Sequence, residues 1–215
     1  MKRRKLDFIF SIGGGLTAVL LLVLGLVLTS QANFAKDYVR DQLLLQKITF
    51  TPAAGLSAEE KSATCIVTNA GKALTTGKQA ECYANNYIGL HVKDINGGKT
   101  YSESSGEARD LQAKADEATK SDPTSPTTLA LVGEAKASAG KVDALFKGET
   151  LRGLLLTTYG FSIFGERAGQ AALVLYLVAA ILAIASIAGL IHAFGTSTEE
   201  LVLPEVPHQK VLADA

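Results

Sequence analysis

Two long runs without charged residues constrain this chain more than any other feature. Residues 8–30 are dominated by Leu, Val, Ile and Gly, and residues 171–194 carry only His192 as a titratable group. A helix needs about 20 residues to cross a bilayer core, and backbone polar groups in lipid must satisfy one another. We therefore expect two transmembrane helices, at 8–30 and 168–194.

The first run could also be a cleaved signal peptide. Basic residues precede it at positions 2–5, and the small residues at 30–32 could form a cleavage site. The run is longer than the usual apolar region of about 7–15 residues in a signal peptide, which favours an uncleaved anchor.

The charge pattern also gives an orientation. The basic cluster predicts that residues 1–7 lie in the cytoplasm. Two spans then return the chain, so the tail at 195–215 is expected in the cytoplasm as well, solvated and disordered. The localisation that follows is a plasma membrane, with the central domain outside it.

The chain between the spans, residues 31–150, is typical of a small helical domain. Ser57 and Glu60 match a capping box that begins a helix, and no alternating pattern predicts a strand. The fold class we predict is an all-α membrane protein with two transmembrane helices flanking a small helical extracytoplasmic domain. Its expected helices lie at 32–48, 57–69, 78–92, 105–119 and 128–146, and its most mobile loop at 121–127.

The helix at 78–92 has the clearest amphipathic pattern of this domain. Its apolar face is expected to contain Ala80, Tyr83, Tyr87 and Leu90.

Cys65 and Cys82 are the two cysteines of the chain, and both fall in the expected external domain. An oxidising compartment favours a disulfide between them. The bond would close a loop of about 17 residues and stabilise the fold by about 3 kcal/mol in the chain-entropy model. The alternative is two buried free thiols.

The stretch before the second span, residues 151–167, is apolar apart from Arg152 and two charges at its end. It is too short to cross a bilayer alone. It could lie at the membrane surface with Tyr159, Phe161 and Phe164 at headgroup depth. It could also begin a long second helix, or pack against the extension of the first helix.

Catalytic groups are scarce. The three histidines, His91, His192 and His208, are expected on different sides of the membrane, and no pair has the spacing of zinc ligands. No nucleophile elbow, phosphate-binding loop or dinucleotide fingerprint occurs. The formal net charge of zero also gives no basic surface for nucleic acid. We expect no enzyme activity, no catalytic residue, no cofactor and no metal.

Small residues mark candidate packing faces in both spans. Small side chains let helix backbones approach closely in lipid. The faces could pack the two spans together or dock them onto another membrane protein. They contain Ser11, Gly14, Gly15 and Ala18 in the first span, and Ala185, Gly189 and Ala193 in the second.

Four segments carry a resemblance to known proteins. They are QLLLQKITFTPAAG at 42–55, GKQAECYANNYIGLHV at 77–92, GGKTYSE at 97–103 and FKGETLRGLLLTTYGFSIFG at 146–165. In these segments the chain resembles a family of two-span actinobacterial membrane proteins, some labelled as a subunit of an aromatic ring-opening dioxygenase. Its architecture is also similar to that of accessory subunits of the actinobacterial respiratory supercomplex.

These observations predict a non-enzymatic accessory or scaffolding protein. Its partners would be the lipid bilayer and other membrane proteins, with a respiratory complex as the candidate that the resemblance implies. The alternative is a binding module for a lipid or another small apolar ligand. A third hypothesis, an enzyme of the dioxygenase type, fits the residues less well, because a non-haem iron site needs histidines and a carboxylate that converge on one metal.

Overall fold

The computed structural model describes residues 3–197, and the rest of the expected tail lies outside this range. Every regular element within it is helical, and one isolated antiparallel bridge joins Thr49 and Ala73. The all-helical prediction is confirmed. The chain divides into two compact units, one formed by the residues up to Asn33 together with those from Arg167, the other by Phe34–Glu166.

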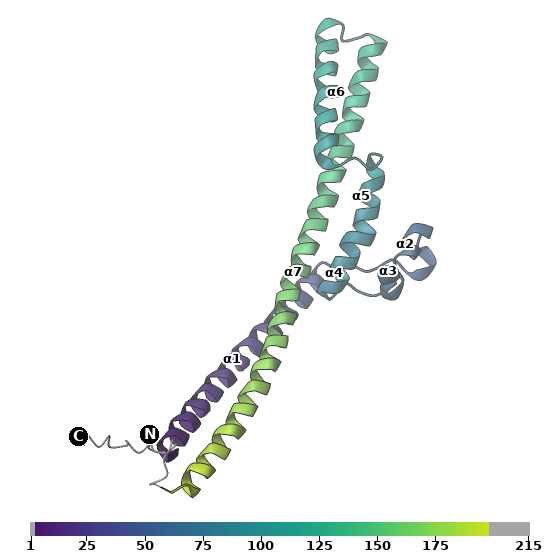
Figure 1. Cartoon of the computed structure of the whole chain (residues 1–215). Helices are drawn as coiled ribbons and strands as arrows, with labels where there is room; N and C mark the ends of the chain where they lie inside the picture. Colours follow the sequence, from purple (N-terminus) through teal and green to yellow (C-terminus); the bar gives the residue numbers. More distant parts are fainter. Residues whose placement is uncertain (1–2, 198–215) are drawn as a thin grey trace, which may run out of the picture. The chain divides into compact units, whose positions relative to one another are not determined.

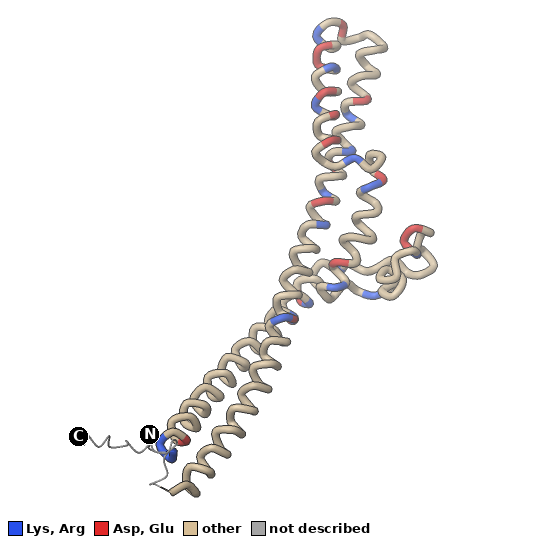
Figure 2. Tube along the Cα trace, viewed as in Figure 1, with Lys and Arg blue, Asp and Glu red and all other residues tan. Residues whose placement is uncertain are grey.

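Two helices supply the first unit. They are α1 (Arg3–Leu45) and α7 (Pro126–Gly195), and both extend into the second unit (Figure 1). Each contains a stretch that is long and apolar enough to cross a membrane. Figure 2 shows these stretches without charged residues between their ends. The prediction of two helices of this kind is confirmed.

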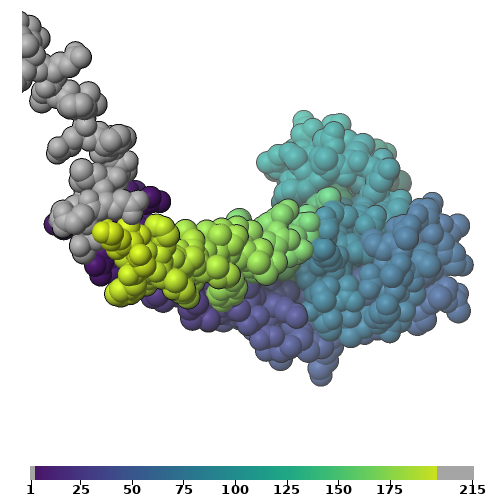
Figure 3. Space-filling view, turned by 60° about the horizontal axis from the view of Figure 1, so that its bottom comes forward, coloured from purple at the N-terminus to yellow at the C-terminus, as the bar shows by residue number. Residues whose placement is uncertain are grey.

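Within the first unit the two helices pack antiparallel. The rings of Phe8 and Phe194 meet edge to face at 5.3 Å between centroids, and Ala32 lies beside Gly169 at the opposite end. The two helices are in contact in the space-filling view (Figure 3). Buried positions recur every seven residues, the spacing of a two-helix coiled coil. They are Ser11, Ala18 and Gly25 on α1 and Ala172, Ala179, Ser186 and Ala193 on α7.

The second unit has a compact core built from short helices against α1 and α7. Ile66, Leu74 and Leu145 are completely buried there, and Phe50 is nearly so. The short elements are η1 (Ala53–Gly55), α2 (Ala58–Ser62), α3 (Thr64–Asn69), α4 (Gly77–Tyr83), the π-helix η2 (Ala84–Ile88) and α5 (Gly89–Ile95).

Three helices of this unit begin with a reciprocal capping box. In each, a Ser or Thr side chain accepts a hydrogen bond from a backbone N–H three residues on, and the side chain there accepts one in return. The predicted box of Ser57 and Glu60 is confirmed. The pairs are Ser57 and Glu60 at α2, Thr76 and Gln79 at α4, and Thr100 and Glu103 at α6 (Tyr101–Ser121).

The predicted helix at 78–92 is present, but its buried face differs. The core positions are the predicted Ala80 together with Ala84, Ile88 and Val92, spaced by four residues, and Cys82 beside them. Tyr83 is only half-buried. A π-turn accounts for the difference, because its wider turn keeps residues four apart on one side. The predicted helix at 57–69 is interrupted at Ala63, which lies between α2 and α3 with an extended backbone.

Helix α6 and the beginning of α7 form an antiparallel hairpin, seen at the top of Figure 1. Its loop is short: α6 ends at Ser121, and α7 begins at Pro126. Asp122 fastens the loop by accepting hydrogen bonds from the N–H groups of Thr124 and Ser125. These bonds lower the pKa of the Asp122 carboxyl, with the Thr124 backbone bond as the largest cause.

The apolar stretch at 151–165 is helical throughout, as part of α7. Leu155 is buried in the core of the second unit, and Phe161 contacts Tyr38 of α1 at 6.0 Å between ring centroids. Two of the three expected arrangements are therefore both present: the stretch is part of a long second helix, and it packs against the extension of the first. Phe164 remains 77% exposed.

Candidate interaction surface

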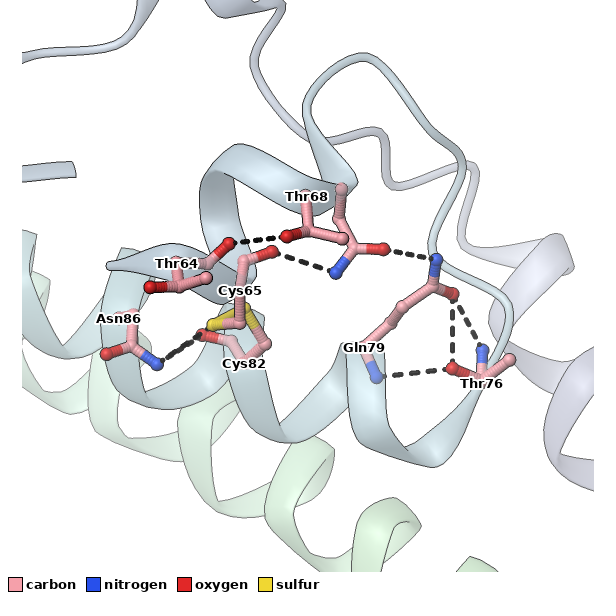
Figure 4. Close-up of a disulfide and its surroundings, with 8 residues drawn as sticks. Thr64, Cys65, Thr68, Thr76, Gln79, Cys82 and Asn86 are labelled. Atoms are coloured by element: carbon pink, nitrogen blue, oxygen red, sulfur yellow. Dashed lines mark hydrogen bonds between the residues drawn. A yellow bond between two sulfur atoms is a disulfide. The ribbon is translucent and has the colours of Figure 1, made fainter. Parts of the chain in front are cut away.

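The disulfide pins the short helices of the second unit. Cys65 on α3 and Cys82 on α4 are bonded, so the predicted disulfide is present. Figure 4 shows the polar contacts around it. The Asn86 amide donates a hydrogen bond to Cys65 Sγ at 3.3 Å, and Gln79 Nε2 donates one to Asn69 Oδ1 at 3.1 Å. The bond lies within a polar cross-link between two helices, which is a structural role.

The two histidines of the described part have separate, local partners. His91 Nδ1 lies 2.7 Å from the Tyr87 carbonyl oxygen, and His192 Nδ1 lies 3.1 Å from Asp7 Oδ2. His208 lies outside the described residues. No group of three or more His, Cys, Asp or Glu side chains within residues 3–197 could hold a metal ion.

A row of aromatic rings crosses the second unit. Tyr83 contacts Phe50 edge to face at 5.2 Å and stacks on Tyr87 at 4.6 Å, and Tyr87 in turn contacts His91 at 4.5 Å. Burial raises the pKa of the Tyr83 phenol, with smaller contributions from Tyr87 and Glu60. The phenol therefore stays protonated at neutral pH, which suits packing rather than nucleophilic chemistry.

Arg152 is the charged residue within the apolar stretch at 151–165, and the sequence patterns do not predict its partners. It lies against the π-helix, where Nη2 donates to Asn85 Oδ1 at 3.4 Å, and Nη1 pairs with Glu149 Oε2 at 3.3 Å. Its Nε is buried and has no hydrogen-bond acceptor among the described residues. The guanidinium joins α7 to η2, which is a packing role.

The small-residue faces of the two apolar helices lie against each other. A methyl group at Gly14 would stand 2.6 Å from Ser186 Oγ, and one at Gly189 would collide with Ser11 Oγ. Ala18 and Ala193 are buried, and Gly15 is partly buried. This is the intramolecular alternative of the two expected from the sequence.

One of the predicted residues, Ala185, lies outside this packing face. Ala185 is exposed, and Ser186, the next residue, occupies the buried position. Ala185 fits a spacing of four residues from Gly189 and Ala193, and this spacing predicts that it shares their face. The buried row instead repeats every seven residues, and such a row drifts by only about 20° per repeat around a helix.

The hairpin carries an open groove of about 460 Å³ between α6 and α7. At its base the rings of Tyr101 and Phe146 meet at 5.7 Å, although 40% and 54% of these residues are exposed. The groove is lined by Tyr101, Ser105, Ala108, Arg109 and Gln112 of α6 and by Ala139, Val142, Asp143 and Phe146 of α7.

A second row of apolar residues follows α7 along the hairpin. Leu129, Val132, Ala139 and Phe146 are spaced by three or seven residues, so they share one side of the helix. All four are exposed. We call these residues the hairpin row. The helical spacing of these residues indicates an apolar face on α7. The face that packs on α6 is the adjacent one, with buried positions such as Thr128 and Ala135.

Comparison with family models, with curated proteins and with solved structures finds no match for this chain. The arrangement of its own side chains is therefore the basis for a functional proposal. The resemblance to two-span actinobacterial membrane proteins stays a prediction.

Proposed function

We propose that this chain is a non-enzymatic accessory or scaffolding protein of a plasma membrane, and that its α6–α7 hairpin docks on partner membrane proteins. The observation that carries the proposal is the hairpin row. Leu129 is 61% exposed, Val132 43% and Phe146 54%. These apolar residues share one side of α7 with the charged Lys136 and Asp143, and apolar anchors at helical spacing among charged residues are typical of a helix-docking surface.

Two observations support a location of the second unit outside the cytoplasm. The disulfide Cys65–Cys82 is favoured in oxidising compartments. The basic residues Arg3, Arg4 and Lys5 at the start of α1 favour a cytoplasmic N-terminus. With α1 and α7 as spans, both chain ends lie in the cytoplasm, and Phe34–Glu166 forms the external domain.

The hairpin is a better candidate for docking than the small-residue faces. Ser11 and Gly189 face each other, as do Gly14 and Ser186, so these faces are already occupied. The hairpin row has no cover within residues 3–197. An amphipathic helix of a partner laid along it would bury both the row and the groove beside it, a mode in which residues at helical spacing act as anchors.

Co-purification tests this proposal. The tagged full-length chain is extracted from its native membrane in a mild detergent, and we expect other membrane proteins to remain bound. The double variant L129K/V132K places two charges in the row. This variant should lose the bound membrane proteins. The respiratory complexes suggested by the resemblance are the first candidates to look for.

The matched control is T127K/A137K, which adds the same charge at two exposed positions of the same helix that are not part of the row. It should retain the partners. A wild-type chain that migrates alone at every detergent concentration contradicts the proposed function. Equal loss, or equal retention, by the two double variants contradicts docking through the hairpin row.

The groove supports a second candidate, a binding module for a small apolar ligand. Its volume of about 460 Å³ falls in the usual range for ligand pockets, ~300–1,000 Å³, and Tyr101, Val142 and Phe146 supply apolar walls. Mass spectrometry of the purified chain tests it: a lipid that is retained by the wild type and lost in Val142→Asp would favour this function over docking.

A further inference from the structure

Four exposed aromatic residues gather where α1 and α7 leave their apolar stretches. Phe34 stacks on Tyr38 at 5.7 Å between centroids, and Tyr38 meets Phe161 at 6.0 Å. Phe164 follows three residues later on α7. We call these four residues the aromatic patch. Their exposed fractions are 57% for Phe34, 49% for Tyr38, 40% for Phe161 and 77% for Phe164.

Three of the four rings, those of Phe34, Tyr38 and Phe161, contact one another, and all four are exposed in the described chain. These rings are large apolar surfaces, and leaving them in water forgoes about 25 cal/mol for each Å² that could be buried. The core of the second unit lies elsewhere, around Phe50, Ile66 and Leu74. Something outside residues 3–197 of this chain is therefore expected to cover the patch.

The length of α1 indicates what this is. The helix is uncharged from residue 8 to residue 35, which at about 1.5 Å per residue amounts to about 42 Å. A bilayer with its headgroups is ~40–45 Å thick. If Asp7 marks one membrane surface, Phe34 lies about 40 Å and Tyr38 about 47 Å further along the helix. At a tilt of about 20°, the average for membrane spans, both rings fall within the opposite headgroup layer.

The side chains around the patch have the polarity of such a boundary. Charged groups lie among the rings: Asp37, between Phe34 and Tyr38, pairs with Arg40 at 3.1 Å, and Glu166, between Phe164 and the apolar run of α7, lies 3.9 Å from Lys78. Apolar rings interspersed with charged groups of both signs match a layer of zwitterionic headgroups. Trp and Tyr are enriched at this depth in membrane proteins, and Tyr38 is the member of the patch of this kind.

We propose that the aromatic patch is a lipid contact that sets the depth of the protein in the outer leaflet, with its rings among the headgroups. The inference rests on the membrane placement given under the proposed function. It goes further, because it assigns the surface at 34–38 and 161–164 to lipid rather than to a protein partner.

Tryptophan fluorescence tests this directly, because the chain contains no Trp. Three single variants are reconstituted in vesicles of a zwitterionic phospholipid: Phe164→Trp in the patch, Ile181→Trp near the middle of the apolar part of α7, and Phe146→Trp in the hairpin row. All three positions are more than half exposed, so the substitutions leave the core intact. Emission is quenched by lipids brominated near the headgroup, by lipids brominated near the chain ends, and by iodide in the water.

We expect Phe164→Trp to lose emission mainly with bromine near the headgroup, Ile181→Trp mainly with bromine near the chain ends, and Phe146→Trp only with iodide. If Phe164→Trp behaves like Phe146→Trp, the patch lies in water and the inference is overturned. If no quencher reaches Phe164→Trp, protein covers the patch, which overturns it equally. If Ile181→Trp escapes both brominated lipids, the membrane placement itself fails, and the docking proposal with it.

Discussion

The disulfide-linked core and the α6–α7 hairpin belong to the same unit but are held together in different ways. In the core, Ile66 and Leu74 are completely buried. In the hairpin, between α6 and the part of α7 that precedes the core residue Leu145, the most buried positions are Ser104, Ala115 and Ala135. A fully buried large side chain contributes about 1.5–3 kcal/mol, whereas Ser and Ala contribute much less.

This difference indicates a division of labour within the unit. The core is stabilised by its own side chains and by a covalent bond. The hairpin is held by a seam whose fully buried residues are small, with Leu111, Leu131 and Val142 only partly buried. Leu129 and Phe146 are exposed. Segments of low local stability are the ones that binding partners commonly order. A region built in this way is suited to completion by another molecule.

The largest expected difference between core and hairpin is the loss of stability when a substitution creates a cavity in the core. We expect Leu74→Ala to destabilise the chain by about 2–5 kcal/mol, because the side chain is fully buried and leaves a void. Leu129→Ala, the same substitution on the hairpin row, should change stability by no more than about 0.5 kcal/mol. Thermal unfolding in detergent, followed by circular dichroism, measures both. Equal losses would remove the distinction between the two regions.

Removal of the disulfide should cause the next largest loss of stability. The double substitution of Cys65 and Cys82 by Ala releases a closed loop with a sequence separation of 17, for which the chain-entropy model gives about 3 kcal/mol. A reducing agent should lower the unfolding temperature of the wild type and leave the double variant unchanged. A reductant effect that persists in the double variant would contradict this assignment.

Overfilling the hairpin seam should have a smaller and more local effect. Ala115 is 1% exposed, so Ala115→Leu is expected to cost about 1–3 kcal/mol by overpacking. Hydrogen exchange should accelerate in 104–142 and stay unchanged around Leu74. A nearby exposed position provides the control, since Ala113→Leu should have no such effect. Faster exchange spread over the whole unit would show that the hairpin and the core unfold together.

The smallest effect concerns the start of α6. The Thr100 N–H and hydroxyl hydrogen-bond the Glu103 carboxylate and lower its pKa. A carboxyl with a lowered pKa in the folded state stabilises the fold above its unfolded value, about 4.3, and this contribution disappears as the pH falls through the folded value. The unfolding temperature of Glu103→Gln should therefore depend less on pH between about 6 and 3 than that of the wild type. Glu117→Gln, at an exposed position of the same helix, should follow the wild type.

Much of the fold was predictable because its signals are local. The two apolar runs predict two long apolar helices by length alone, and Ser57 with Glu60 predicts a helix start by hydrogen-bonding geometry. The disulfide was predictable since Cys65 and Cys82 had no other partner. The loop at 122–125 followed from the turn-forming residues there.

The remaining features depend on packing that a sequence pattern does not contain. A helical period of 3.6 predicts Tyr83 and Tyr87 on the buried side, and the π-turn at 84–88 makes Ala84 and Ile88 the buried positions instead. The exposure of the hairpin row is not predictable from the sequence, because the regular spacing of Leu129 and Val132 indicates an ordinary core face. In the structure, α6 packs on the adjacent side of the helix, at positions such as Thr128 and Ala135.

The π-turn at η2 also bears on insertions and deletions. Its wider turn, in which the Gly89 N–H reaches the Ala84 carbonyl five residues back, lets an apolar row spaced by four stay in phase with the core. Deletion of one residue between Ala84 and Ile88 would turn this bond into the ordinary one between residues four apart, so a regular α-helix would form with Gly89 and Val92 still in phase with the core. A deletion in the regular turns of α4 would instead rotate the residues after it by about 100°. This helix is therefore expected to tolerate the loss of one residue at η2 better than the loss of one residue in its regular turns.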